Sequence, residues 1–139
     1  MIPIHYLAVV GGAIASMIIG FVWYGPLFGK SWLILSGITP EQMEKASKQG
    51  MSSSYLISFL GSLLMSYVLA HALIFASTYL QVQGIQAGLT AGFWNWLGFI
   101  MPVTLGSVLW EKKPWKLWII NNGYYLVTLL VMGSILALW

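Results

Sequence analysis

An amide between two indoles, Trp94-Asn95-Trp96, lies in the middle of a long apolar stretch from Gly84 to Trp110. Steps of three and four residues return to the same face of a helix, so one stripe should contain a polar group among small residues. The predicted stripe is Gly88, Gly92, Asn95, Phe99, Pro102 and Gly106. Asn95 would then face out of a glycine groove with Trp94 and Trp96 to either side, which makes these three residues our first candidate ligand-binding or ion-binding site.

A second candidate is His71, the one ionisable side chain deep inside an apolar run. Histidine in a membrane is costly unless partnered, and it is the residue type that changes charge nearest physiological pH, so proton coupling is one interpretation. The other is a neutral histidine bonded to Tyr67, Asn95 or a backbone carbonyl. At ~1.5 Å per residue His71 and Asn95 fall at similar depths, which allows a shared site without establishing one.

The last apolar run adds the amides of Asn121 and Asn122, and Tyr125 lies on the same stripe as Asn121. Pro102 removes a backbone donor from the preceding run and should kink it, and one of these amides could bond to a freed backbone group. Kinked helices and intramembrane amides occur in transporters, and equally they serve to fix helix register.

The composition places all of these residues in a membrane. The chain of 139 residues is 59% hydrophobic and 6% charged, whereas soluble domains are roughly a quarter charged. Each of four apolar runs, charged only at Lys116 near the start of the last, is near the ~20 residues that cross ~30 Å of hydrocarbon. We therefore predict one all-α membrane domain, residues 1–139, with four transmembrane helices in two hairpins: residues 4–26, 55–79, 85–109 and 115–138.

The distribution of lysine predicts the orientation. The basic residues occur only in the first and third loops and, for Lys116, at the adjoining start of the last run: Lys30, Lys45, Lys48, Lys112, Lys113 and Lys116. By the positive-inside rule these loops are cytoplasmic and both termini lie outside the cell membrane. The net charge of +3 is thus a topology signal, and nucleic acid is excluded as a partner. Within the first loop, Thr39-Pro40-Glu41-Gln42 predicts the start of a short cytoplasmic helix that ends near Lys48.

Ribbons of small residues predict close helix packing and, with Pro102, form the expected packing set: Gly12, Ser16, Gly20, Ser62, Ser66, Gly84, Gly88 and Gly92. The second run carries two polar faces, one of serines and one with Tyr67 and His71. Four helices would struggle to cover both faces, so we expect a homo-oligomer in the lipid bilayer.

Several chemistries are not expected. The chain has no cysteine, its three acidic residues lie in loops, and its two histidines lie at different depths. These features argue against a metal site, a cofactor and a Ser-His-carboxylate triad, and we do not expect an enzyme.

The chain resembles a known family along its whole length. The residues that carry the resemblance are the run from Trp23 to Trp32, beginning Trp-Tyr-Gly-Pro, and in the second half Trp96-Leu97-Gly98-Phe99, Pro102, Glu111-Lys112-Lys113 and Gly123-Tyr124. It is similar to the bacterial membrane family catalogued as domain of unknown function 1761. That resemblance implies four spans and an unassigned activity, so no catalytic residue is implied.

Three functions remain open. The first, which we favour, is an oligomeric transporter or channel for an unknown ion or small molecule that uses His71, Asn95, Asn121 and the two tryptophans. The second is an accessory module that packs against lipid or a partner protein through its small-residue ribbons. The third is a binder of an apolar membrane-soluble ligand held between tryptophans and oriented by one amide.

Overall fold

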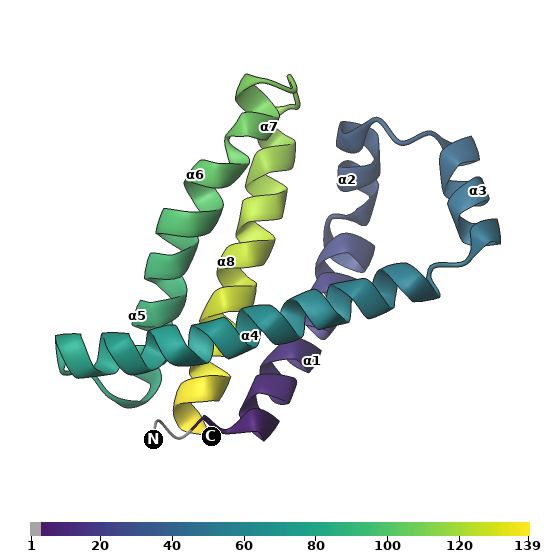
Figure 1. Cartoon of the computed structure of the whole chain (residues 1–139). Coiled ribbons are helices and arrows are strands. Elements are labelled where there is room, and N and C mark those ends of the chain that lie inside the picture. The colour runs from purple at the N-terminus through teal and green to yellow at the C-terminus, as the bar shows by residue number, and fades with distance from the viewer. Residues whose placement is uncertain (1–3) are drawn as a thin grey trace.

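The structure, a computed structural model that describes residues 4–139, is built almost entirely of helices (Figure 1). Four helical stretches are long and apolar enough to cross a membrane: Tyr6–Leu27, Ser52–Leu80, Gly84–Leu109 and Trp115–Leu138. The predicted all-α class and its four spans are confirmed, and every predicted boundary lies within one helical turn of the observed one.

Two spans are single helices and two are interrupted. The intact spans are α4 (Ser52–Leu80) and α8 (Trp115–Leu138). The first span is α1 (Tyr6–Val22) followed by the π-helical turn η1 (Trp23–Leu27). The third span consists of α5 (Gly84–Asn95), the π-helical turn η2 (Trp96–Ile100), α6 (Met101–Thr104) and α7 (Gly106–Leu109). Between the first two spans lie α2 (Gly29–Ser36) and α3 (Pro40–Gln49).

The predicted start of the loop helix is confirmed in α3. The backbone N–H of Gln42 donates to the Thr39 hydroxyl at 3.2 Å, and the Gln42 side chain accepts from the Thr39 N–H at 3.0 Å. This reciprocal capping box satisfies two backbone donors that the first helical turn leaves unpaired.

The most extensive helix contact joins α5 to α8. The two backbones touch at glycines: Gly88 packs directly on the Gly133 carbonyl, and a Cβ at Gly92 would lie 2.5 Å from the Leu129 carbonyl oxygen. Helices in lipid associate through such close packing because no hydrophobic force distinguishes a partner helix from a lipid tail. The α5 and α8 hairpin is therefore the most tightly joined part of the fold.

The other small-residue ribbons also pack within the chain. A Cβ at Gly12 of α1 would lie 2.5 Å from the Ser66 hydroxyl of α4 and 2.9 Å from the Met132 side chain of α8. Gly20 faces Tyr124 of α8. Gly84, which we grouped with these residues, is instead the first residue of α5, has a φ of +59° and would place a Cβ with nothing within 4 Å, so its role is to form the turn from α4 into α5.

The α4 helix crosses α1 and α8 obliquely, and its first turns extend beyond the bundle toward α3 (Figure 1). Between Ser52 and Leu60 only Phe59 is partly buried, whereas Ser62, Ser66 and Leu69 are buried further along the same helix. The helix is thus clamped along its middle and diverges from the bundle toward its start.

The single stripe predicted along the third span is wrong beyond Asn95. Gly88 and Gly92 are buried, but Phe99 is 72% exposed and Pro102 is also exposed. The π-helical turn η2 contains more residues per turn than an α-helix, so it rotates every later residue away from the glycine face.

The contact of α5 with α8 predicts a steric penalty at Gly88. In Gly88→Ala the new Cβ collides with the rigid Gly133 carbonyl, and we expect a loss of about 1–3 kcal/mol of unfolding free energy, typical of overpacking. The matched control is Gly61→Ala in α4, where a Cβ meets nothing within 4 Å. Thermal unfolding in detergent micelles, followed by tryptophan fluorescence, should show a lower midpoint for Gly88→Ala only. Equal midpoints for the two variants would contradict the close contact.

Candidate functional site

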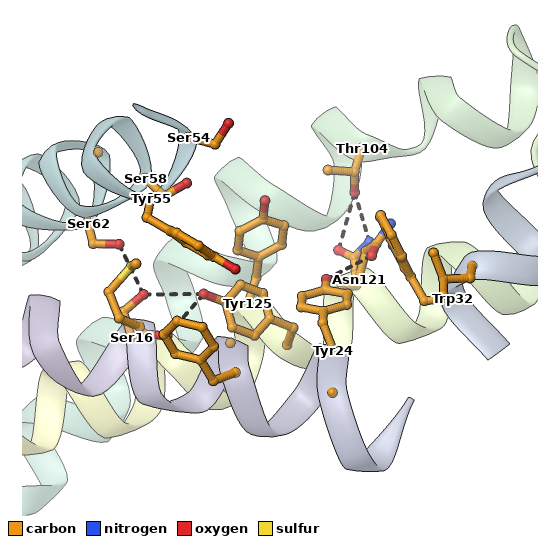
Figure 2. Close-up of a pocket in the computed structure, with 18 of the residues that line it drawn as sticks. Ser16, Tyr24, Trp32, Ser54, Tyr55, Ser58, Ser62, Thr104, Asn121 and Tyr125 are labelled. Atoms are coloured by element: carbon orange, nitrogen blue, oxygen red, sulfur yellow. Dashed lines mark hydrogen bonds between the residues drawn. The ribbon is translucent and has the colours of Figure 1, made fainter. Parts of the chain in front are cut away.

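A groove of about 1570 Å³ lies where α4 diverges from the rest of the bundle. It is bordered by α1, η1 and α2, by the first half of α4, by α6 and α7, and by α8, with α3 at its edge. Figure 2 shows hydroxyl and amide groups from several of these elements, including Ser58, Thr104, Asn121 and Tyr125. Four segments that are distant in sequence therefore contribute polar groups to one cavity between membrane-spanning helices.

The inner end of the groove is closed by three hydroxyls from three helices. The Ser16 hydroxyl, in a residue only 1% exposed, lies 3.1 Å from the Ser62 hydroxyl and 3.3 Å from the Tyr124 hydroxyl. The Tyr124 hydroxyl also lies 3.2 Å from the Ser16 carbonyl oxygen and donates to it. These bonds connect α1, α4 and α8 at the point where α4 begins to diverge.

Two aromatic side chains hold η1 against α8. The Trp23 indole N–H donates to the Ile120 carbonyl at 2.9 Å, and the Tyr24 hydroxyl donates to Asn121 Oδ1 at 2.8 Å. The indole fits because the facing residue is Gly123, where a Cβ would lie 2.9 Å from the Trp23 ring. The Trp-Tyr pair thus orients the side of the groove formed by the first span.

Four aromatic rings form a continuous series along this side, which we call the aromatic wall: Trp32, Tyr24, Tyr124 and Tyr125. Their successive ring centroids are 5.6, 5.2 and 5.2 Å apart, in edge-to-face or tilted arrangements. From the opposite side Tyr55 reaches out from α4 toward the wall (Figure 2).

The interrupted third span is tied to α8 by a group that we call the polar latch: Trp96, Thr104, Trp118 and Asn122. The Asn122 amide donates to the Thr104 hydroxyl at 2.9 Å, and the Trp118 indole donates to the same hydroxyl at 3.1 Å. The Trp96 indole donates to the Asn122 carbonyl at 3.0 Å. The Thr104 hydroxyl also bonds to the Ile100 carbonyl at 2.9 Å, so it occupies a backbone acceptor near Pro102.

The groove combines a mainly apolar lining with uncharged polar groups and is almost without charge. Of the described residues that line it, Glu111 alone is charged, and it is exposed in the loop between α7 and α8. The interior polar groups are hydroxyls and amides. An ionised ligand would find no counter-charge there, whereas a neutral hydrogen-bonding ligand would find both donors and acceptors.

Some of the residues singled out in the sequence line this groove: Asn121, Asn122, Tyr125, Ser16, Gly20 and Ser62. Others do not, and each of the two candidate centres bonds to its own helix. His71 Nδ1 lies 2.9 Å from the Tyr67 carbonyl oxygen, and the Asn95 amide donates to the Ala91 carbonyl at 2.8 Å. These bonds match the structural alternative for His71.

The two tryptophans beside Asn95 do not form the expected pair of walls. Trp94 is 59% exposed, while Trp96 points to α8 and belongs to the polar latch. Several residues of the groove were not predicted as site residues: Tyr24, Tyr55, Ser58, Thr104 and Tyr124. The available signal was the Trp-Tyr-Gly-Pro run, whose aromatic residues are typical of a membrane interface but here lie against α8.

Comparison with known proteins gives one match. Residues 7–137 match the profile of a family described as "Protein of unknown function (DUF1761)". No curated protein and no solved structure matches the chain.

The polar latch predicts energetic coupling between the third and fourth spans. In Thr104→Val and Asn122→Leu each substitution removes the shared bond, so the double variant should cost less than the sum of the single variants, by about 1 kcal/mol. Unfolding free energies measured in micelles for the four proteins of this cycle provide the test. The matched control pairs Thr78→Val, an exposed residue of α4, with Asn122→Leu, and these should be additive. Additivity of Thr104→Val with Asn122→Leu would contradict the latch.

Proposed function

We propose that this chain, which belongs to the DUF1761 family of proteins of unknown function, is a transporter that binds a small neutral molecule in the groove. The observation that carries the proposal is a cavity of about 1570 Å³ that is bordered by all four membrane-spanning stretches and whose mainly apolar lining contains uncharged polar groups. Hydrocarbon cannot bond to such groups, so a polar surface at this depth is costly unless water or a solute occupies it.

Unsatisfied hydroxyls in the groove support a ligand. Within residues 4–139 no hydrogen bond is made by the side chains of Ser54, Ser58 or Tyr125. Serine in a helix can bond back to its own backbone, as Ser134 does to the Leu130 carbonyl at 2.8 Å. Ser107 of the groove also bonds in this way, to the Thr104 carbonyl at 2.9 Å, whereas Ser54 and Ser58 leave that option unused, which keeps their hydroxyls available to a solute.

Breaks in two spans support movement. The π-helical turn η1 ends the first span and η2 interrupts the third, and the third is interrupted again where α6 gives way to α7. Turns of this kind occur often at functional sites, and interrupted helices are a recurrent feature of transporters. Both spans border the groove, so bending at these breaks would change its width while the α5 and α8 contact stays intact.

The accessory-module alternative has weaker support. That alternative depends on ribbons of glycine and serine as surfaces for a partner. Gly88, Gly92 and Gly12, however, pack against other helices of the same chain. The homo-oligomer stays a prediction. One polar face of α4 is covered by α1, while Tyr67 on the other face is 40% exposed.

The native chain has no cysteine, so a single cysteine can report access to the groove. We expect Ser58→Cys, in proteoliposomes of known orientation, to react with a membrane-impermeant maleimide applied from either side, because a transporter exposes its site to each side in turn. The control is Phe99→Cys, which is lipid-facing and does not line the groove, and it should react from neither side. Reaction of Ser58→Cys from one side only, or from neither, would refute transport through the groove.

A further inference from the structure

We infer that the groove takes a neutral amphipathic molecule whose planar ring carries a hydrogen-bond acceptor and an alkyl chain, as in an alkylated quinone. This inference rests on the proposed function and names its substrate class. Three properties of the groove lead to it: the lack of charge, the aromatic wall, and the placement of two unused donors beside that wall.

The lack of charge excludes ionised substrates. Glu111 is the one charged group among the described lining residues, and it is exposed at the edge of the groove. The interior is bounded by Ser16, Tyr24, Asn121 and Tyr125, none of which could neutralise an ion. A buried charge without a partner is strongly disfavoured, so a substrate that enters this cavity is neutral.

The aromatic wall favours a planar ring. Two of its three tyrosines are held before a ligand binds, because the Tyr24 hydroxyl is held by Asn121 at 2.8 Å and the Tyr124 hydroxyl by Ser16 at 3.2 Å. Rings that are already immobilised lose little entropy when a ligand stacks on them. Tyr55 faces the wall from α4 (Figure 2), so a ring between the two sides would meet aromatic groups on both faces.

The unused donors favour an acceptor on that ring. Asn121 Oδ1 already accepts from Tyr24, which leaves its Nδ2 group to donate. Across residues 4–139 neither Asn121 Nδ2 nor the Tyr125 hydroxyl has a hydrogen-bond partner. These two side chains are one helical turn apart on α8, so both lie on the face that lines the groove. A ring carbonyl is the neutral acceptor that both could reach.

The rest of the lining suits an alkyl chain. Apolar side chains, several of them methionines, surround the polar part: Met17, Phe21, Met43, Met51, Met65 and Val103. Methionine adapts to irregular apolar shapes, and α4 diverges here from the bundle, so a flexible tail would pack among these residues. Together the polar and apolar parts indicate an amphipathic substrate rather than a sugar or an amino acid.

The experiment measures equilibrium binding of three probes to the full chain in lipid nanodiscs. The probes are 2-decyl-1,4-benzoquinone, decylbenzene, which lacks the acceptor, and N-decylpyridinium, which carries a charge. We expect saturable binding of the quinone, about tenfold tighter than that of either other probe after correction for empty nanodiscs. Asn121→Leu should weaken quinone binding about tenfold, and Tyr125→Phe should weaken it several-fold.

Two matched controls accompany these variants. Asn95→Leu removes an amide that bonds within α5, and Tyr79→Phe removes the hydroxyl of a tyrosine that is 87% exposed at the end of α4. Both should bind the quinone as the native chain does. Tyr125→Phe removes a hydroxyl without a partner and should fold normally, so the test holds even if Asn121→Leu, which also loses the Tyr24 bond, does not fold.

If the quinone and decylbenzene bind equally well, or if Tyr125→Phe leaves quinone binding unchanged, the substrate does not need a hydrogen-bond acceptor. Either result would refute the proposed substrate class. If N-decylpyridinium binds more tightly than the quinone, the inference that the substrate is neutral is wrong. If no probe binds saturably while Ser58→Cys still reacts from both sides, the substrate class fails and the transport function stands. If Ser58→Cys also fails to react from both sides, the transport function fails as well.

Discussion

The direct contact of two helix backbones, α5 against α8, is the constraint on which the rest of the structure depends. Gly88 and Gly133 allow this contact because neither carries a side chain. In lipid, helices gain from association mainly through such close packing and through hydrogen bonds between helices. The core formed by Leu69, Ala91, Leu129 and Met132 lies beside it. The hairpin is thus a fixed base against which the first two spans can be arranged.

The groove follows from how α4 is held against that base. Small residues at Gly12, Ser62 and Ser66 let α1 and α4 approach closely, and the Ser16 hydroxyl bonds to Ser62 at 3.1 Å. Toward its start α4 has no comparable contact and diverges (Figure 1). A straight helix that is clamped at its middle and crosses its neighbours obliquely must leave a wedge of space at one end. That wedge is the groove, so the same serines that close its inner end also define its position.

The sequence was sufficient for the spans and for the start of α3, because hydrophobicity, helix length and capping act locally. It was not sufficient for the site. Asn95 was the most conspicuous amide, but η2 changes the phase of its helix and the amide bonds to Ala91. Pro102 predicts a kink in the third span, but a proline does not show whether the break takes the form of a π-helical turn. Nothing local distinguishes an interfacial tyrosine from Tyr24, whose role depends on the distant Asn121. The residues of the groove could be named, but only the packing of α4 could bring them together.

Whether a polar side chain has a hydrogen-bond partner within the chain distinguishes residues that hold the fold together from residues that are free to bind a ligand. Thr104 and Asn122 bond to each other, and His71 and Asn95 each bond to a carbonyl of their own helix, so these four side chains contribute to holding the helices. In the described part of the chain, two buried hydroxyls lack partners, Ser66 and Thr128; both lie inside helix contacts that no solute could reach. The unused groups of the groove differ, because they adjoin open space. Polarity alone therefore does not identify a site in a membrane protein, but polarity left unsatisfied beside a cavity does.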